Sequence, residues 1–384
     1  MTTRGLTGLA RHAGPLATAL CLFALESSSL VQSAFSAAPA RSDVSVTPGQ
    51  KRNQSFQLEP SAKFHGSEAE FQPVVALDPA KGEWPAGLAV DAQGNLYVAL
   101  IGLDQIRQVT LDGAVKIFAQ LPAPARRKTA TTLGLAFAPS GHLYVTRSSA
   151  DPATHGIWRV SPDGKISDRF AALPPGFPNA LAFDKSGNLY VSDSAEGQLR
   201  IWKIETRGKA SAWKTEPRRP GNDAGSAVNA TFGANGIAFD RSGKSLYVAS
   251  TDSGRIQRIP LNGDGTAGDS VVFAQSEQLI GADGIAFDLN GNLFVTVNRA
   301  DRLVVISPQG CLATIAEGEP LQHPASLVIG VSGNPETLWI ANLAVMESPG
   351  LTKGTPLAGL MRLRKGERDL LRPAAEVSST REVR

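Results

Sequence analysis

The sequence contains little cysteine and histidine and has no strong excess of charge of either sign. Two cysteines cannot form a disulfide scaffold, and the five histidines never fall at a zinc-ligand spacing. The 38 basic and 35 acidic residues leave a net charge of +3, which gives no electrostatic reason to expect nucleic acid as a partner. The sequence also lacks a Gly-x-Ser-x-Gly elbow, an HExxH motif and a phosphate loop. Serine hydrolases and zinc proteases therefore have no support in the sequence.

The N-terminus has the order of regions found in an export signal. Arg4 and Arg11 lie in a short basic region, an uncharged apolar stretch covers residues 14–25, and small residues follow at 36–40. This order predicts a signal peptide over residues 1–38 and a secreted or periplasmic protein. The apolar stretch is about half the length that spans a bilayer, so we expect no membrane span in the mature chain.

Two further expectations concern this end of the chain. Leu20 precedes Cys21 at a place where a lipid-modified cysteine requires a small residue, so a lipoprotein is the less favoured alternative. Residues 39–70 are polar and rich in serine and proline, which predicts a flexible leader.

One pattern recurs through the rest of the chain. A short apolar segment rich in small residues leads into a Gly-containing turn and then into an aromatic, β-branched segment. Five clear copies and a weaker sixth cover residues 85–98, 133–145, 178–191, 234–248, 282–295 and 324–341. Equivalent positions are 42 to 56 residues apart, as between 283 and 325 and between 179 and 235. A repeat of this length indicates one structural unit per copy.

Each unit holds four short strands. After the two segments of the repeat, a third segment alternates, as at 198–204 and 255–259, and a fourth resembles 115–118 or 271–273. Four antiparallel strands at a period of about 40–50 residues are the signature of a β-propeller blade. The sequence therefore predicts an all-β, six-bladed β-propeller.

The sixth unit indicates how the ring closes. It supplies a third strand at 360–364, after which the chain becomes a charged tail at 367–384. The missing fourth strand is available before the first unit, at 71–77. Joining both ends in one blade would leave no exposed sheet edge, so we expect the last blade of a propeller at 71–366 to be closed by the N-terminal strand.

One position of the first strands is polar in three consecutive units. The six equivalent residues are Ala86, Leu133, Asn179, Asn235, Asp283 and Ala325. The simplest alternative is that Asn-Gly and Asp-Gly are turn dipeptides. However, Gly87 and Gly134 follow Ala and Leu, so a turn would not require the polar residues. Consecutive blades bring their side chains to one side of the axis, and amide and carboxylate oxygens suit a hard cation such as Ca²⁺.

Residues 71–365, with these Asn and Asp positions, resemble the gluconolactonase and regucalcin (senescence marker protein) family and, more distantly, diisopropyl fluorophosphatase and the paraoxonases. The resemblance implies that Asn179, Asn235 and Asp283 bind calcium in the channel. The family also takes a Glu from the first blade, where this chain has Ala86. Glu83 lies three residues upstream, and whether it substitutes is left open.

The resemblance implies an exported, calcium-dependent hydrolase of a lactone or related ester, with another divalent cation possible. Asp283 would hold the metal and help to activate water. We expect a monomer acting on a small molecule, with Asp193 contacting the substrate. The other polar residues that follow second strands, expected to be solvated loop residues, are Arg147, Glu196, Asp252 and Asn298.

A second function stays open. The chain could be a non-catalytic, NHL-like propeller that binds a protein, peptide or carbohydrate, with the polar channel residues as structural hydrogen bonders. The Asn and Asp series favours the hydrolase, whereas Ala86 favours the binding protein.

Overall fold

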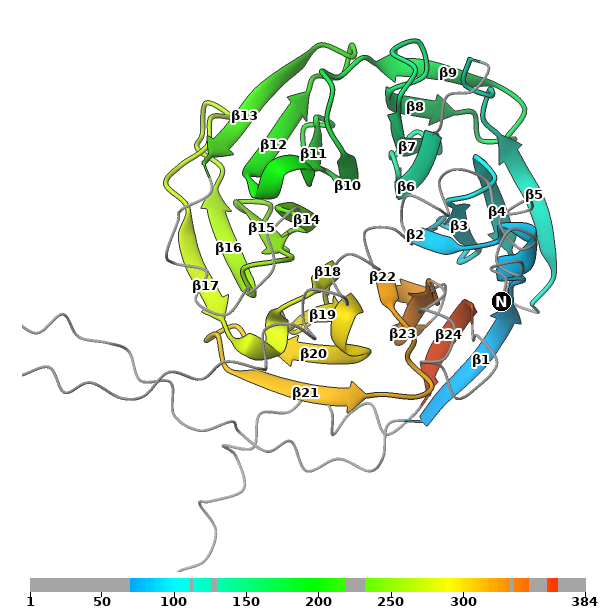
Figure 1. Ribbon diagram of the computed structural model, residues 1–384. Coiled ribbons are helices and arrows are strands. Elements are labelled where there is room, and N and C mark those ends of the chain that lie inside the picture. The colour runs from blue at the N-terminus through cyan, green and yellow to red at the C-terminus, as the bar shows by residue number, and fades with distance from the viewer. Residues whose placement is uncertain are drawn as a thin grey trace, which may run out of the picture.

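The strands form six four-stranded antiparallel sheets set in a ring (Figure 1). This computed structural model describes residues 70–110, 113–125, 130–217, 232–331, 334–344 and 358–364, and the count of sheets refers to these. The prediction of an all-β, six-bladed propeller is confirmed. The predicted signal peptide (1–38) and charged tail (367–384) lie outside the described residues, as does nearly all of the predicted leader (39–70).

In blades 1 to 5 the strands run outward from the axis in the order of the chain. Blade 1 contains β2 (Pro85–Val90), β3 (Leu96–Leu100), β4 (Gln105–Val109) and β5 (Val115–Gln120). Blade 2 contains β6 (Ala130–Phe137), β7 (Leu143–Ser149), β8 (Gly156–Val160) and β9 (Ser167–Ala171). Blade 3 contains β10 (Pro178–Phe183), β11 (Leu189–Asp193), β12 (Leu199–Ile204) and β13 (Ala210–Glu216).

The second half of the ring repeats this order. Blade 4 contains β14 (Ala234–Phe239), β15 (Ser245–Ser250), β16 (Arg255–Pro260) and β17 (Val271–Gln275). Blade 5 contains β18 (Ala282–Phe287), β19 (Leu293–Val297), β20 (Arg302–Ile306) and β21 (Leu312–Glu317). Blade 6 contains β22 (Pro324–Val331), β23 (Asn334–Asn342), β24 (Gly359–Arg364) and, outermost, β1 (Glu70–Ala76). Short 3₁₀ helices are η2 (Pro79–Lys81), η3 (Ala195–Gly197), η4 (Glu277–Leu279) and η5 (Asn298–Ala300).

Aromatic side chains of the repeat bind neighbouring blades together. Tyr97 on β3 packs edge-on between Phe118 of its own outer strand and Phe137 of the next blade's inner strand, with ring centroids 4.8 Å apart in both pairs. Equivalent tyrosines in blades 2, 3 and 4 make the same two contacts. Edge-to-face pairs are favourable beyond the area they bury, so this part of the repeat stabilises the seams between blades.

The innermost strands approach one another so closely that only a glycine fits at some contacts. A methyl group at Gly87 would collide with the carbonyl oxygen of Leu133 in the next blade, and one at Gly236 would collide with that of Asp283. These glycines serve the close approach of two backbones. The small residues of the first segment therefore reflect crowding at the axis.

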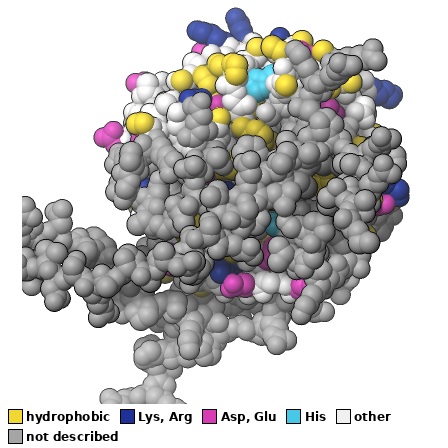
Figure 2. Space-filling model, in the orientation of Figure 1, with side chains coloured by type: hydrophobic (Ala, Val, Ile, Leu, Met, Phe, Trp, Pro, Cys, Tyr) yellow, Lys and Arg dark blue, Asp and Glu magenta, His cyan; other side chains and the backbone are white. Residues whose placement is uncertain are grey.

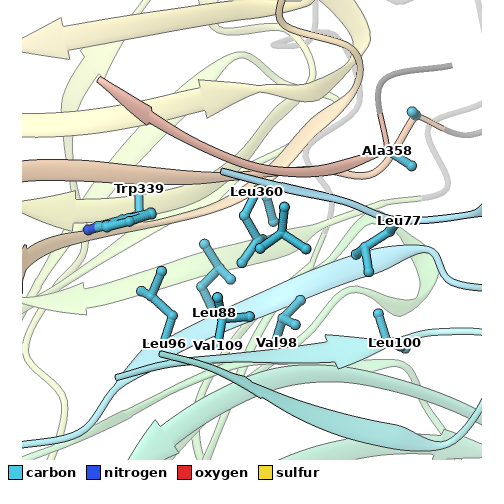
Figure 3. Packing of buried hydrophobic residues seen from close by; sticks show 12 residues of the cluster. Leu77, Leu88, Leu96, Val98, Leu100, Val109, Trp339, Ala358 and Leu360 are labelled. Carbon is cyan, nitrogen blue, oxygen red and sulfur yellow. The ribbon is translucent and has the colours of Figure 1, made fainter. Parts of the chain in front are cut away.

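The ring closes where the two ends of the described chain meet. β1 pairs antiparallel with β24, as expected, and this joins residues nearly 300 positions apart. A hydrophobic cluster then packs blade 6 against blade 1, with Trp339 and Leu360 facing Leu88 and Leu96 (Figure 3). The closed ring leaves no blade of the described chain without a neighbour on each side.

The outer surface carries basic and acidic side chains of both signs in the view of Figure 2. Of the described segments, none forms a helix with the length and hydropathy needed to traverse a lipid bilayer.

The closure seam should carry a large share of the stability. Leu360 is buried between β1 and blade 1, so Leu360→Ala should lower the free energy of unfolding by about 2–5 kcal/mol, because it leaves a cavity. Urea unfolding measures the loss. Leu289→Ala is the matched control, since that side chain is 56% exposed, and a change of less than about 0.5 kcal/mol is expected. Equal effects of the two substitutions would show that the seam is not stabilising.

Candidate functional site

A β-bulge sets the direction of the site residues. In blade 3, Pro178 pairs with Asp193, but the next paired residue is Leu181, so Asn179 and Ala180 are left out of the ladder. Blades 4 and 5 show the same irregularity around Asn235 and Asp283. Bulges re-aim side chains and occur next to active sites. Because these residues lie inside β10, β14 and β18, the alternative that the Asn-Gly and Asp-Gly pairs are turn dipeptides is wrong.

Two buried hydroxyl groups orient the two amides. The Nδ2 of Asn179 donates to the Oγ of Ser194 (3.1 Å), and that hydroxyl donates to the carbonyl of Ala234 (2.7 Å). One blade further on, the Nδ2 of Asn235 donates to the Oγ1 of Thr251 (3.0 Å), which donates to the carbonyl of Ala282 (2.9 Å).

Each relay has a chemical consequence. In each relay (Asn179 with Ser194, and Asn235 with Thr251) one N–H of the amide is used in the hydrogen bond to the hydroxyl, so the Oδ1 of the same amide points away from that hydroxyl. Within the described residues neither Oδ1 accepts a hydrogen bond, so both oxygens are available as ligands. Ser194 and Thr251 were not predicted from the sequence, although both directly follow the end of a second strand.

Asp283 lies beside Asn235. The Asn235 side chain hydrogen-bonds the Asp283 carboxyl group, and burial raises the pKa of Asp283 to about 7 against the opposing effects of that bond and of the Arg299 charge. Arg299 itself is paired with Asp252, with 2.5 Å between Nη1 and Oδ1. A nearby cation would stabilise the charged form of a carboxyl group in this environment. Without such a cation, the group binds a proton more readily than an exposed carboxylate does.

These donors fit a hard divalent cation. Gly236 lies against the backbone of Asp283, which brings residues 235 and 283 side by side, and the Ser194 relay ties Asn179 to the strand that carries Asn235. Two amide oxygens and one carboxylate make an oxygen-only set of the kind that calcium takes. In the described chain no three His, Cys, Asp or Glu residues cluster as a metal site. Any metal held here would therefore depend on the amides.

Glu83 does not replace the acid missing at Ala86. Its Oε1 pairs with Nη2 of Arg107 at 2.6 Å, and its Oε2 accepts a hydrogen bond from the backbone N–H of Asp78 at 3.0 Å. Both carboxylate oxygens of Glu83 are therefore bound by partners outside the ring of site residues, that is, the six equivalent positions 86, 133, 179, 235, 283 and 325. The question left open by the sequence is answered by this ion pair, and the donor set contains one carboxylate.

Asp193 ends β11 with its carboxylate occupied by protein donors. Oδ1 accepts from the backbone N–H groups of Phe177 (2.8 Å) and Ala195 (3.1 Å), and Oδ2 accepts from Nε1 of Trp202 (3.2 Å). The side chain is almost fully buried. The structure thus shows Asp193 fixing the position of Phe177, and contact with a substrate stays a prediction.

Of the four residues that were expected to be solvated loop residues, two are buried, so the expectation was wrong for Arg147 and Asp252. Arg147 is fully buried and pairs with Asp104, with 2.6 Å between Nη2 and Oδ2. Asp252 is 6% exposed and pairs with Arg299. Asn298 donates to the carbonyl of His323 at 3.1 Å, and the side chain of Glu196 lies outside the description.

The other three blades carry apolar residues at the equivalent places. One cluster joins Ala86, Leu133 and Ala325 with the residues that follow two second strands. Those two residues are Ile101 and Leu343. From the sequence, only the missing acid at Ala86 was evident in this half, because single apolar residues at a channel look like ordinary core residues.

A cavity of about 700 Å³ occupies the rest of the channel. Its lining begins one residue beyond the ring of site residues, at positions such as Gly87, Ala180 and Ser326, and reaches the turns after the first strands. The site residues therefore lie at one end of the channel, the end where the first strands begin and the second strands end.

Residues 218–343 match the family described as the SMP-30/Gluconolactonase/LRE-like region. This segment contains Asn235 and Asp283, and it confirms the resemblance expected from the repeat. No curated protein matches the sequence.

Solved structures share the fold at low sequence identity. A calcium-binding protein, regucalcin, from Agrobacterium tumefaciens is 18% identical, with a TM-score of 0.57 over 75% of this chain and 92% of that one. A gluconolactonase from Xanthomonas campestris is 17% identical, with a TM-score of 0.53 over 80% and 98%. A virginiamycin B lyase from Staphylococcus aureus is 18% identical, with a TM-score of 0.51 over 72% and 82%. Because these proteins differ in activity, the likeness shows the fold, and function has to be argued from the site.

The raised pKa of Asp283 predicts a pH-dependent stability of the metal-free protein. A carboxyl group that titrates near 7 when folded and near 4 when unfolded stabilises the native state below pH 4, and this contribution is lost as pH rises to 7. In the presence of a chelator, the free energy of unfolding of Asp283→Asn relative to the parent should therefore rise by about 1–4 kcal/mol between pH 4 and pH 8. Urea unfolding at each pH measures the difference. Asp163→Asn, in an exposed turn, should show no such gain, and a flat difference for Asp283→Asn would contradict the assignment.

Proposed function

We propose that the protein is a hydrolase of a lactone or related ester that uses a divalent cation, calcium in the first place, held by Asn179, Asn235 and Asp283. The observation that carries the proposal is the joint orientation of these side chains. Two amides are anchored through their nitrogen atoms, and the one carboxylate lies against the second amide. The family match over residues 218–343 supports the reaction class.

The chemistry is a hydrolytic ring opening. Bound calcium supplies a Lewis acid for the carbonyl oxygen of the substrate. The Asp283 carboxylate accepts a proton from a water molecule while the water oxygen bonds to the carbonyl carbon. The bond from that carbon to the ring oxygen then breaks, and the proton passes to the leaving oxygen to give a hydroxy acid. The pKa of about 7 belongs to the metal-free site, and a bound cation would lower it because it stabilises the charged carboxylate.

The single carboxylate sets an expectation for affinity. Calcium sites with few charged ligands bind in the range of roughly 10⁻⁴–10⁻³ M that is typical of extracellular modules. Weak binding of this kind suits a protein that meets calcium outside the cytoplasm. We therefore propose export, as the N-terminal order of basic, apolar and small residues predicts, and we propose that the closed ring acts as a monomer.

A binding function without catalysis is the second candidate. Ala86 replaces the acid of the family, and Glu83 is held by Arg107, so the site has lost one negative charge. The polar residues would then serve as hydrogen bonders for a ligand in the channel. The experiment below separates the two candidates.

Two measurements test the proposal together: the effect of calcium on Tm and the hydrolysis of a panel of lactones and aryl esters. Because calcium binds only the native site, a concentration of 100 times the Kd should stabilise the protein by about 2.7 kcal/mol, seen as a rise in Tm in a thermal scan. Hydrolysis of lactones or aryl esters should need the same cation. Asp283→Ala should abolish the rise in Tm and lower kcat/KM by about 10²–10³-fold.

The exposed Asp163→Asn variant is the control and should retain both properties. A folded protein that shows neither a rise in Tm with Ca²⁺, Mg²⁺, Mn²⁺ or Zn²⁺ nor any turnover would favour the binding function.

The hydroxyl relay gives a separate prediction. Thr251→Val removes the acceptor for the Asn235 amide with little change in volume, so the amide can rotate. Calcium affinity measured by calorimetry should fall about tenfold, as for other groups that orient metal ligands, and Thr251→Ser should restore it. Ser148→Ala, at the equivalent place in blade 2, is the matched control, because that hydroxyl contacts the carbonyl of Gly176 (3.4 Å). Equal affinities for all variants would show that the relay does not position a ligand.

A further inference from the structure

The end of the channel that holds the site is divided into two chemically different halves. Blades 3, 4 and 5 contribute Asn179, Asn235 and Asp283 together with the hydroxyls that anchor the amides. Blades 6, 1 and 2 contribute Ala325, Ala86 and Leu133 at the same positions, joined by Leu343 and Ile101 in one hydrophobic cluster. Because blades 6, 1 and 2 are neighbours in the ring (Figure 1), their side chains form one continuous apolar wall.

The rim, formed by the residues two positions before the site residues, follows this division only in part. The residue whose carbonyl accepts a hydrogen bond from the first backbone N–H after the second strand is Trp84 in blade 1 and Phe177 in blade 3. Both rings are partly buried and pack on the apolar cluster. In blades 4 and 5 the equivalent residue is Gly233 or Gly281, and in blade 6 it is His323. Trp84 thus extends the apolar wall in blade 1, and Phe177 packs on it from blade 3, the blade of Asn179. In the blades of Asn235 and Asp283 the equivalent residue has no side chain.

Phe177 continues the aromatic surface toward blade 4. Its ring meets that of Phe232 edge-on, with 5.8 Å between centroids. Its backbone N–H is held by Asp193, and that of Phe232 by Oδ2 of Asp252 at 2.8 Å. The two buried acids therefore place the aromatic residues of the rim, which gives them a purpose other than contact with a substrate.

We propose that the substrate carries an apolar alkyl or aryl group beside its carbonyl, and that sugar lactones are poor substrates. The carbonyl has its polar partners on blades 3 to 5, so the body of the molecule lies against Leu133, Ile101 and Leu343. The hydroxyl groups of a sugar lactone would face Leu133, Ile101 and Leu343, which offer no hydrogen bond, and this disfavours them. The Nε1–H of Trp84, beside the same cluster, is a buried donor without a partner among the described residues. This inference rests on the proposed hydrolase function.

A series of γ-lactones with alkyl substituents of one to eight carbons tests the inference. Each added methylene should raise kcat/KM about threefold to fourfold until the wall is filled. Gluconolactone should be at least about 100-fold worse than the best member of the series. A series of 2-alkylcyclopentanones, which cannot be hydrolysed, tests the wall alone through the rise in Tm that binding causes.

Two variants locate the effect. Leu133→Asn should flatten the dependence on chain length in both series, because it puts a polar group in the wall. Phe177→Ala, at the rim, should reduce the same slope and keeps the test available if Leu133→Asn does not fold. Ile117→Asn is the matched control on the exposed outer strand β5, where the side chain is 60% exposed, and should leave the slope unchanged.

The outcomes separate the two proposals. If ketone binding grows with chain length but no lactone is hydrolysed, the apolar wall stands and the hydrolase function fails. If lactones are hydrolysed with no dependence on chain length, or gluconolactone is the best substrate, the hydrolase stands and this inference is overturned. A slope that Leu133→Asn, Phe177→Ala and Ile117→Asn all leave unchanged would also overturn it.

Discussion

The close approach of neighbouring innermost strands is the constraint on which the site depends. In four blades of the described ring the residue after the site position is a glycine that lies against the backbone of the next blade. The contact fixes how far apart successive site residues can be. The bulge leaves residues 179, 235 and 283 out of the ladder at equivalent positions of their blades. The close contact between backbones therefore places their side chains around one axis.

The polar half of the site then depends on small, buried hydrogen bonds. Ser194 and Thr251 each accept from an amide and donate to the backbone of the following blade. The same hydroxyl thus orients a ligand and joins two blades, which links the geometry of the site to the assembly of the ring. Asp193 and Asp252 have a related role, because each holds an aromatic residue at the rim. Buried carboxylates near a channel are in this case mostly structural, and Asp283 is the one that faces Asn235.

The division of the channel mouth bears on function more than the fold does. Proteins with very different activities share this ring at 17–18% identity, so the fold alone selects no reaction. Under the proposed function, the three polar blades would hold a cation and the carbonyl group of the substrate, and the three apolar blades would contact a substrate body without hydroxyl groups. Ala86 belongs to this second feature, since it continues the apolar wall.

The sequence by itself determined the repeat, the number of blades, the strand that closes the ring and the three polar positions, because each is local: a period, a strand pattern or a residue type at a fixed offset. Tertiary structure decided what those residues contact. Glu83 looked available from its distance along the chain, but Arg107 on β4 holds it. Arg147 and Asp252 looked like solvated loop residues, but both are buried and form ion pairs with residues 43 and 47 positions away. The apolar wall joins residues from 84 to 343. A contact of this kind depends on the closed ring, and no local pattern in the chain records it.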